Sequence, residues 1–234
     1  ASPGIGFKAP EFGDHSAMKD LGLQQKATQA YLSTCTFVDR CVGVLLDGLE
    51  AYGYAEDTVV VLWGDHGWHL GEKSHWRKHA LWEESTRTPL IWSVPGFGEE
   101  DEVCERVVSL LDVYPTLMDL CDISVDQSFD GSSLKALIET PDAYWDRPIV
   151  TTYGYKNHSV RSEDYRYTVY SDGTEELYNH RRDPNEYNNI AGQKNAEDIK
   201  DRLKNRLPVT NAEDPAANSE FLAIPELVRL KIEN

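Results

Sequence analysis

A short run of β-branched and apolar residues, Thr58 to Trp63, most narrows what this chain can fold into. It shows no alternation of polar and apolar positions, which is typical of a strand buried on both faces in the centre of a parallel sheet. It follows a long amphipathic segment and ends at Gly64-Asp65-His66-Gly67. We therefore expect a buried strand of an α/β layered domain, with polar residues directly after its carboxyl end.

The residues around this run predict the other elements of that domain. Residues 1–20 are rich in Gly, Pro and charge and indicate a loop or an extended segment. From about Gln24 to Tyr52, apolar residues recur at intervals of three and four, which predicts one long helix, and Gly53 is a helix stop signal. A second strand is expected over residues 89–94, and a second helix beginning near Leu111–Asp112.

The pattern of apolar and polar residues changes after about Asp122. Short alternating segments at 147–153, 158–163, 165–171 and 175–179 predict strands, and Asp172-Gly173 between two of them is a strong hairpin signal. A helical stretch near 196–206 precedes an irregular tail from Pro208. We therefore expect residues 1–122 to belong to a large α/β domain, and residues 123–234 to form a small α+β domain with an antiparallel sheet.

Composition excludes some partners. The chain of 234 residues carries a net charge of −17, from 40 acidic and 23 basic residues, which argues against nucleic acid and anionic membranes. No apolar run is long enough to span a bilayer, and no signal peptide is visible, so the compartment stays open. The four cysteines fit no metal-binding spacing; buried free thiols are the default expectation, and a bridge between Cys104 and Cys121 is the alternative.

The segment after the first strand carries the chemistry. Asp65 and His66 can both reach one divalent cation, and Gly64 and Gly67 would let the backbone turn tightly around it. A bare Asp-His-Gly string is more often a plain turn. Three tryptophans within fifteen positions nevertheless indicate that the loop packs against the protein, and that its positively charged side chains are packed as well. These tryptophans are Trp68, Trp76 and Trp82.

Four motifs, in order, resemble type I sulfatases of the alkaline-phosphatase superfamily, particularly the iduronate-2-sulfatase-like branch. They are Val60 to Glu72 with Trp76-Arg77-Lys78, Thr88 to Gly96, Val108 to Leu117, and Glu176-Leu177-Tyr178-Asn179 with Asp183-Pro184-Asn185-Glu186. The resemblance implies that Asp65 and His66 are ligands of a calcium ion, and that Lys78 contacts the sulfate and the nucleophile. It implies a sulfuric ester hydrolase acting on a sulfated small molecule or sugar.

Other residues carry weaker expectations. His69, His75, Arg77 and His79 lie in the same loop, so His75 and Arg77 are candidates for substrate contact, although packing or surface roles are commoner for such residues. His158 opens a strand that resembles a segment reaching over the pocket in related sulfatases, and the alternative is a plain strand-end histidine. Surface ion pairing is expected for Arg166, Arg181 and Arg182.

The sequence also departs from the family. The sulfatase nucleophile is a formylglycine made within a C-x-P-S-R or S-x-P-S-R motif, and neither motif is present. We therefore expect a C-terminal portion that is inactive alone, needs an N-terminal half and exposes a sheet edge prone to self-association. A phosphoric or phosphonic ester hydrolase of the same superfamily and a non-catalytic accessory chain are the alternatives. A periplasmic, secreted or lysosome-like location is implied by resemblance alone.

Overall fold

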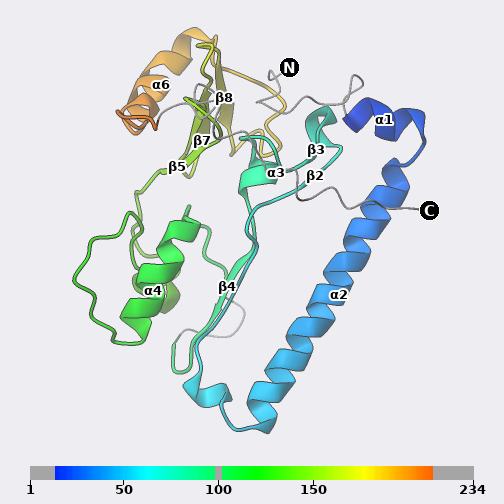
Figure 1. Cartoon of the computed structure of the whole chain (residues 1–234). Coiled ribbons are helices and arrows are strands. Elements are labelled where there is room, and N and C mark those ends of the chain that lie inside the picture. Colours follow the sequence, from blue (N-terminus) through cyan, green and yellow to red (C-terminus); the bar gives the residue numbers. More distant parts are fainter. Residues whose placement is uncertain (1–13, 98–101, 213–234) are drawn as a thin grey trace, which may run out of the picture.

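The computed structural model describes residues 14–97 and 102–212. One long helix, α2 (Gln24–Ala51), runs along one side, and a narrow two-stranded ladder lies next to it (Figure 1). A four-stranded sheet with helix α6 (Glu197–Lys204) forms the other end of the molecule (Figure 1). The segment expected to be a loop at the N-terminus instead holds helix α1 (Asp14–Asp20), while residues 1–13 lie outside the described part.

Helix α2 matches its predicted bounds. It ends where Gly53 adopts a left-handed φ of 74°, and the Gly53 and Tyr54 amides donate to the carbonyls of Glu50 and Leu49. None of its residues is buried. Large apolar side chains project from it into solvent, among them Leu32, Phe37, Val44 and Leu45. Most protein helices are stabilised by packing of their apolar face against another element. The apolar face of α2 has no such packing partner among the described residues.

The first predicted strand is present but is paired differently from the expectation. Strand β1 (Val60–Trp63) pairs antiparallel with β4 (Leu90–Ser93), in the register Val60↔Ser93 to Trp63↔Leu90. The prediction of a central parallel strand is therefore wrong for the described part of the chain. A parallel pair needs a long helical crossover, whereas the connection here contains only the four-residue helix α3 (Glu83–Thr86) and a 3₁₀ turn, η2 (Glu72–Ser74). Trp63 and Ile91 are about half exposed.

The second half forms the predicted antiparallel sheet. Its strands β5 (Ile149–Thr152), β6 (His158–Arg161), β7 (Tyr165–Val169) and β8 (Glu175–Asn179) pair in sequence order. The hairpin at Asp172-Gly173 is confirmed: Gly173 has φ 83°, and the Asp172 Oδ1 accepts a bond of 2.9 Å from the Thr174 amide. The sheet and α6 share a buried core of Val160, Tyr167, Leu177, Ala191, Ala196 and Leu203.

A buried aspartate organises the connection between the two parts. Asp112 ends the turn η3 (Leu110–Asp112), which leads into α4 (Val113–Leu120), and it forms a capping box with Ser109. Its Oδ1 accepts from the Arg147 guanidinium at 2.6 Å and from the Ser132 amide at 2.8 Å. Short elements complete the chain: η1 (Ala55–Asp57), α5 (Lys135–Glu139) and η4 (Lys194–Ala196).

Two further expectations can be compared with the structure. The cysteines are free, so Cys104 and Cys121 form no bridge, but all four are exposed, and the expectation of buried thiols is wrong. Cys35 and Cys41 lie on α2, so their exposure follows from the uncovered state of that helix. Among the described helices, none combines the length and apolar composition needed to cross a bilayer.

Candidate active-site segment

The connection between β1 and β4 carries the predicted site residues, and two glycines fix its path. The Gly64 amide donates to the Pro89 carbonyl at 3.2 Å, and the Gly67 amide donates to the Ser85 carbonyl at 2.9 Å. A Cβ atom on Gly67 would overlap the carbonyl oxygens of Glu84 and Arg87, and one on Gly64 would overlap the Thr88 hydroxyl. Close approach of backbone to backbone therefore requires glycine at position 67, whereas at position 64 a side chain would meet the Thr88 side chain. The expectation that these glycines allow a tight turn around a cation stays a prediction.

The structure brings Asp65, His66 and Lys78 together. The His66 Nε2 lies 3.2 Å from the Asp65 Oδ2 and 2.7 Å from the Lys78 Nζ. The ring stacks on Trp68, which in turn stacks on Tyr31 of α2, with centroids 6.2 and 6.3 Å apart. Lys78 follows strand β3 (Trp76–Arg77), which pairs with β2 (His69–Leu70), so a small hairpin delivers the ammonium to the end of β1.

The donor set partly fits a divalent cation. The His66 Nδ1 lies 2.9 Å from the Gly67 carbonyl, an acceptor, so this nitrogen carries the proton, and the Nε2 lone pair accepts from the Lys78 ammonium at 2.7 Å. A histidine that ligates a metal ordinarily donates its other N–H in this way. The Asp65 carboxylate is 82% exposed and open to a ligand. Calcium takes about six to eight ligands, so these two residues form only part of such a site.

The three weaker candidates, His75, Arg77 and His158, contact residues other than Asp65, His66 and Lys78. His75 packs edge-on against His69 and Trp82, with ring centroids 4.8 and 5.9 Å away, and burial lowers its pKa. Arg77 pairs with Asp14 of α1 through its Nε at 2.8 Å. His158 is buried, with its ring nitrogens 2.8 Å from the Thr152 hydroxyl and 2.7 Å from the Asn211 amide oxygen.

The turn between β2 and β3 is held in an uncommon backbone conformation. Lys73 and Ser74 in this turn have φ values of 52° and 57°, and Arg77 at the end of β3 has φ 70°. The Lys73 ammonium lies 4.6 Å from the Trp82 ring centroid and 4.4 Å from that of Tyr178, and it donates to the Tyr178 hydroxyl and the Glu186 carbonyl. Burial lowers the pKa of Lys73. The C-terminal sheet therefore restrains the hairpin that carries Lys78.

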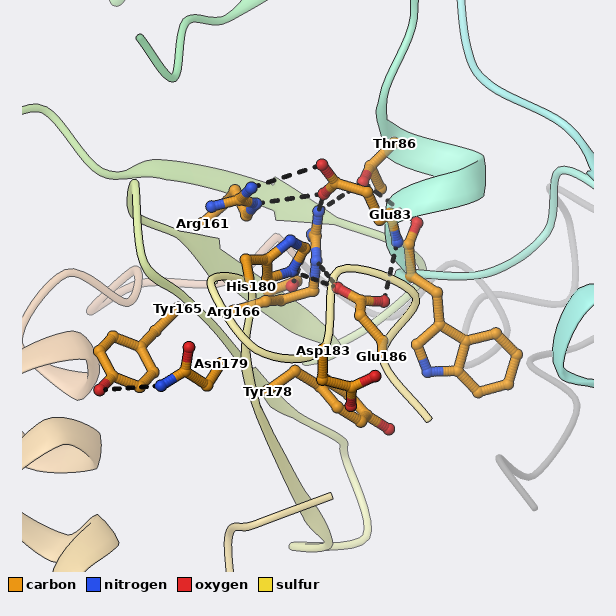
Figure 2. A network of polar contacts seen from close by, with 12 residues as sticks. Glu83, Thr86, Arg161, Tyr165, Arg166, Tyr178, Asn179, His180, Asp183 and Glu186 are labelled. Atoms are coloured by element: carbon orange, nitrogen blue, oxygen red, sulfur yellow. Dashed lines mark hydrogen bonds and ion pairs between the residues drawn. The ribbon is translucent and has the colours of Figure 1, made fainter. Parts of the chain in front are cut away.

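A buried ionic network joins the same two regions (Figure 2). Arg166 on β7 is 2% exposed and extends toward the segment after Lys78, where its guanidinium contacts the Glu83 carboxylate and donates to the Thr86 hydroxyl at 2.9 Å. Its Nε donates to the Glu186 Oε1 at 2.6 Å. The prediction that Arg166 makes a surface pair is therefore wrong, whereas Arg181 does pair at the surface, with Asp164.

Both carboxylates are stabilised in their charged form. Burial raises the pKa of Glu83, but the Arg166 and Arg161 guanidiniums outweigh that effect and hold it at about 2. The pKa of Glu186 is also lowered, because the bonds from His180 and the charge of Arg166 outweigh burial. Ligand atoms of Glu83, His180 and Glu186 lie within 4.8 Å of one another, a spacing that could hold a metal ion. Since Arg161 and Arg166 together already balance the charges of both carboxylates, we interpret this cluster as structural.

The sequence indicated this network only indirectly. Glu186 belongs to the Asp-Pro-Asn-Glu motif that carried part of the resemblance, and its Oε2 accepts the Glu83 amide at 2.9 Å. Asp183 of the same motif accepts the Tyr187 and Asn188 amides and so fixes the turn. The motif therefore maintains the junction between the small sheet and the segment after Lys78.

Comparison with known proteins identifies the family. The chain matches the family described as "Sulfatase" over residues 8–123. It matches the family described as "N-sulphoglucosamine sulphohydrolase, C-terminal" over residues 71–213, which is more than half of its length. The chain belongs to the sulfatase family. The resemblance to sulfatases seen in the sequence is thereby confirmed, while its assignment to the iduronate-2-sulfatase-like branch stays a prediction.

Individual sulfatases support this placement. A sulfatase of Formosa agariphila is 39% identical over 86% of this chain and 39% of its own length. An arylsulfatase of Clostridium perfringens is 31% identical over 76% and 38%, and an N-acetylglucosamine-6-O-sulfatase of Bacteroides thetaiotaomicron is 30% identical over 72% and 33%. The chain therefore spans between a third and two fifths of the length of these relatives.

Solved structures confirm the predicted α/β fold. One protein, solved in complex with its substrate D-glucosamine-2-N,6-O-disulfate, superposes with a TM-score of 0.69 at 26% identity, over 85% of this chain and 41% of that one. A phosphonate monoester hydrolase of Agrobacterium radiobacter gives a TM-score of 0.64 at 21% identity, over 79% and 40%. At that identity the second likeness shows a shared fold only.

Proposed function

We propose that this sulfatase-family chain is the C-terminal portion of an enzyme that hydrolyses a sulfate ester, and that it supplies part of a calcium and sulfate site. The observation that carries the proposal is the convergence of Asp65, His66 and Lys78, three residues from two segments, on one point beyond β1. Asp65 and His66 would each give one ligand atom to calcium. When bound, calcium would offset the negative charge that develops on the sulfate oxygens as the S–O bond breaks.

Lys78 would hold the sulfate group. Its ammonium has three donors; the one directed at the His66 Nε2 in this structure would be released when that nitrogen binds calcium, and the other two are available for sulfate oxygens. The hairpin that carries Lys78 is restrained from behind by Lys73 and by the network around Arg166. Such restraint positions a charged donor before substrate arrives, which lowers the cost of reorganisation during the reaction.

The missing parts of the site would come from an N-terminal half. The formylglycine motif is absent from this sequence, and the related sulfatases are more than twice as long as the matched region. Helix α2 exposes an apolar face along its length, and Trp63 and Ile91 extend that exposure onto the β1–β4 ladder. We infer that an N-terminal half covers these surfaces, and that the chain alone is inactive and prone to self-association.

The substrate class would be a sulfated sugar. Support comes from relatives: one is an N-acetylglucosamine-6-O-sulfatase, and a solved neighbour binds a disulfated glucosamine. The iduronate-2-sulfatase-like branch, with its sulfated sugar substrate class, is consistent with the Gly-Trp-His-Leu-Gly-Glu continuation after His66. His75, Arg77 and His158 are proposed to contribute to substrate contact only once the N-terminal half has completed the pocket.

Calcium titration tests the proposal. Calorimetry would compare the chain, Asp65→Ala and the exposed control Asp126→Ala, each alone and joined behind the N-terminal portion of the Formosa agariphila sulfatase. We expect tight binding only in the joined protein, abolished by Asp65→Ala and retained by Asp126→Ala. Tight binding by the chain alone would contradict the assignment of a partial site. Absence of binding in every form would favour the accessory-chain alternative.

Activity of the joined protein tests the reaction. Expressed in a host that makes formylglycine, it should hydrolyse 4-nitrophenyl sulfate, and Lys78→Ala should reduce kcat/KM by at least tenfold. Asp126→Ala is again the control. Faster hydrolysis of 4-nitrophenyl phosphate or of a phosphonate monoester than of the sulfate would favour the ester-hydrolase alternative.

A further inference from the structure

A cavity of about 320 Å³ lies away from the segment that carries Asp65, His66 and Lys78. It is formed by α6, by the β6–β7 turn and by the loop before β5, none of which contributes a residue to that triad. Its volume is at the lower end of the range of small-ligand sites. The lining residues used below are Arg106, Tyr144, Trp145, Glu163, Arg202 and Arg206.

The charges lining this cavity leave two cations free. Glu163 is already paired with Arg106 at 2.8 Å, and Asp164 is paired with Arg181. The side chains of Arg202 and Arg206 make no hydrogen bond or ion pair with the described residues, and the carboxylate of Asp146 makes none either. Two free guanidiniums therefore face one free carboxylate, in a chain whose net charge is −17. Two unpaired guanidiniums beside one cavity of so acidic a chain favour an anionic ligand.

The two free arginines are arranged to act together. Arg202 lies in the last turn of α6 and Arg206 lies two residues beyond its end, and both line the same cavity. A guanidinium offers a planar fork of donors that matches an oxyanion better than a point charge does. The pair would fit the three outer oxygens of one sulfate group.

Two aromatic residues, Tyr144 and Trp145, also line the cavity. Tyr144 is 88% exposed, which is unusual for so large a ring. The adjacent Trp145 is anchored by a bond of 3.1 Å from its Nε1 to the Val107 carbonyl. Arg106 holds the same loop through the carbonyls of Asp142 and Ala143, at 2.9 and 3.1 Å. An exposed ring on a loop whose backbone is already held suits the apolar face of a sugar, because little loop freedom is lost on binding.

We propose that this cavity binds a sulfated sugar unit at a second site, separate from the site that holds the sulfate ester to be hydrolysed. Arg202 and Arg206 bind the sulfate group, and Tyr144 packs against the sugar ring. A chain-like substrate could then be held at two points at once, which raises its effective concentration at the ester site. The choice of a sugar sulfate as ligand rests on the proposed function, whereas the cavity and its charges do not.

Binding of D-glucosamine 6-sulfate, followed by calorimetry and by amide NMR of the whole chain, tests this site. Unsulfated glucosamine and inorganic sulfate are the ligand controls. We expect millimolar or tighter binding that needs both the sugar and the sulfate, with amide shifts on α6 and the 141–148 loop. Arg202→Gln/Arg206→Gln and Tyr144→Ala should each weaken binding at least tenfold.

Matched variants separate this proposal from the proposed function. Arg181→Gln removes an exposed arginine that is already paired, and Asp65→Ala alters only the ester site; both should leave binding unchanged. Circular dichroism verifies that each variant is folded. Loss of binding in Asp65→Ala, retention in the double variant, equal binding of inorganic sulfate alone, or no sulfate-dependent binding at all would each overturn the second site. None of these results would bear on calcium binding by the joined protein.

Discussion

Replacing Arg166 with Met removes the guanidinium that joins Glu83 to Glu186 while keeping most of the apolar stem of the side chain. Both carboxylates lie in the interior, with exposed side-chain fractions of 15% and 1%. Breaking a buried pair by removing one partner costs about 3–5 kcal/mol. Glu83 keeps Arg161 and Glu186 keeps His180, so we expect the lower end, ~3 kcal/mol, for the free energy of unfolding.

The assay is urea unfolding combined with hydrogen exchange, which reports the local free energy of opening of β6 to β8 and of residues 81–86. Arg181→Met is the matched control, because Arg181 is 74% exposed in its pair and exposed pairs contribute at most ~1 kcal/mol. We expect faster exchange on both sides of the junction in Arg166→Met alone. If Arg166→Met costs no more than Arg181→Met, the interpretation of the network as a buried structural junction is wrong.

Acidity provides an independent check on the same network. The pKa of Glu83 is about 2 in the folded chain and 4.5 as a free side chain, so its stabilising effect is complete above pH 4.5 and is lost as pH falls toward 2. Without Arg166 the folded pKa of Glu83 should rise toward its ordinary value. We therefore expect the stability difference between the original chain and Arg166→Met to shrink as pH falls from 4.5. A difference that is constant with pH would contradict the electrostatic origin.

Three further predictions concern single positions. Gly67→Ala should displace the backbone at Glu84 and lower the melting temperature by several degrees, measured by circular dichroism, since its Cβ has no room. Burial and the neighbouring His75 lower the pKa of His69 from 6.5 to about 4, so stability should fall by up to ~3 kcal/mol as pH drops from 6.5 to 4, and urea titrations of His69→Gln should lose that slope. Gly173→Ala, at φ 83°, should cost ~1 kcal/mol in urea unfolding, and Gly192→Ala almost nothing.

The local elements followed from patterns within short stretches of sequence. The three-and-four spacing of apolar residues predicted α2, and Gly53 predicted its end, because helix geometry repeats every 3.6 residues and glycine adopts positive φ without strain. Alternation and the Asp172-Gly173 turn predicted the hairpin of β7 and β8. The convergence of Asp65, His66 and Lys78 was expected only through the resemblance to sulfatases, since two of the three are neighbours and the third lies twelve positions beyond His66.

No local sequence pattern predicted the contacts between segments that are distant in the chain. Arg166 contacts Glu83 across 83 positions, and Lys73 reaches the Tyr178 hydroxyl across 105. A single arginine on a strand with alternating polarity has the same local appearance whether its face meets solvent or another segment. Surface pairing was the expectation, and only the docking of residues 81–86 onto the sheet made that position interior.

Helices α2, α4 and α6, the strands of the small sheet and the family could be read from the sequence, because each depends on local periodicity or on motifs of contiguous residues, while helix α1 was missed. The tertiary structure alone decided which partners those elements meet: the antiparallel pairing of β1 with β4, the burial of Arg166 and the unburied face of α2. The physical reason is that burial and pairing depend on what packs against a residue, and an individual residue type does not specify its distant neighbour.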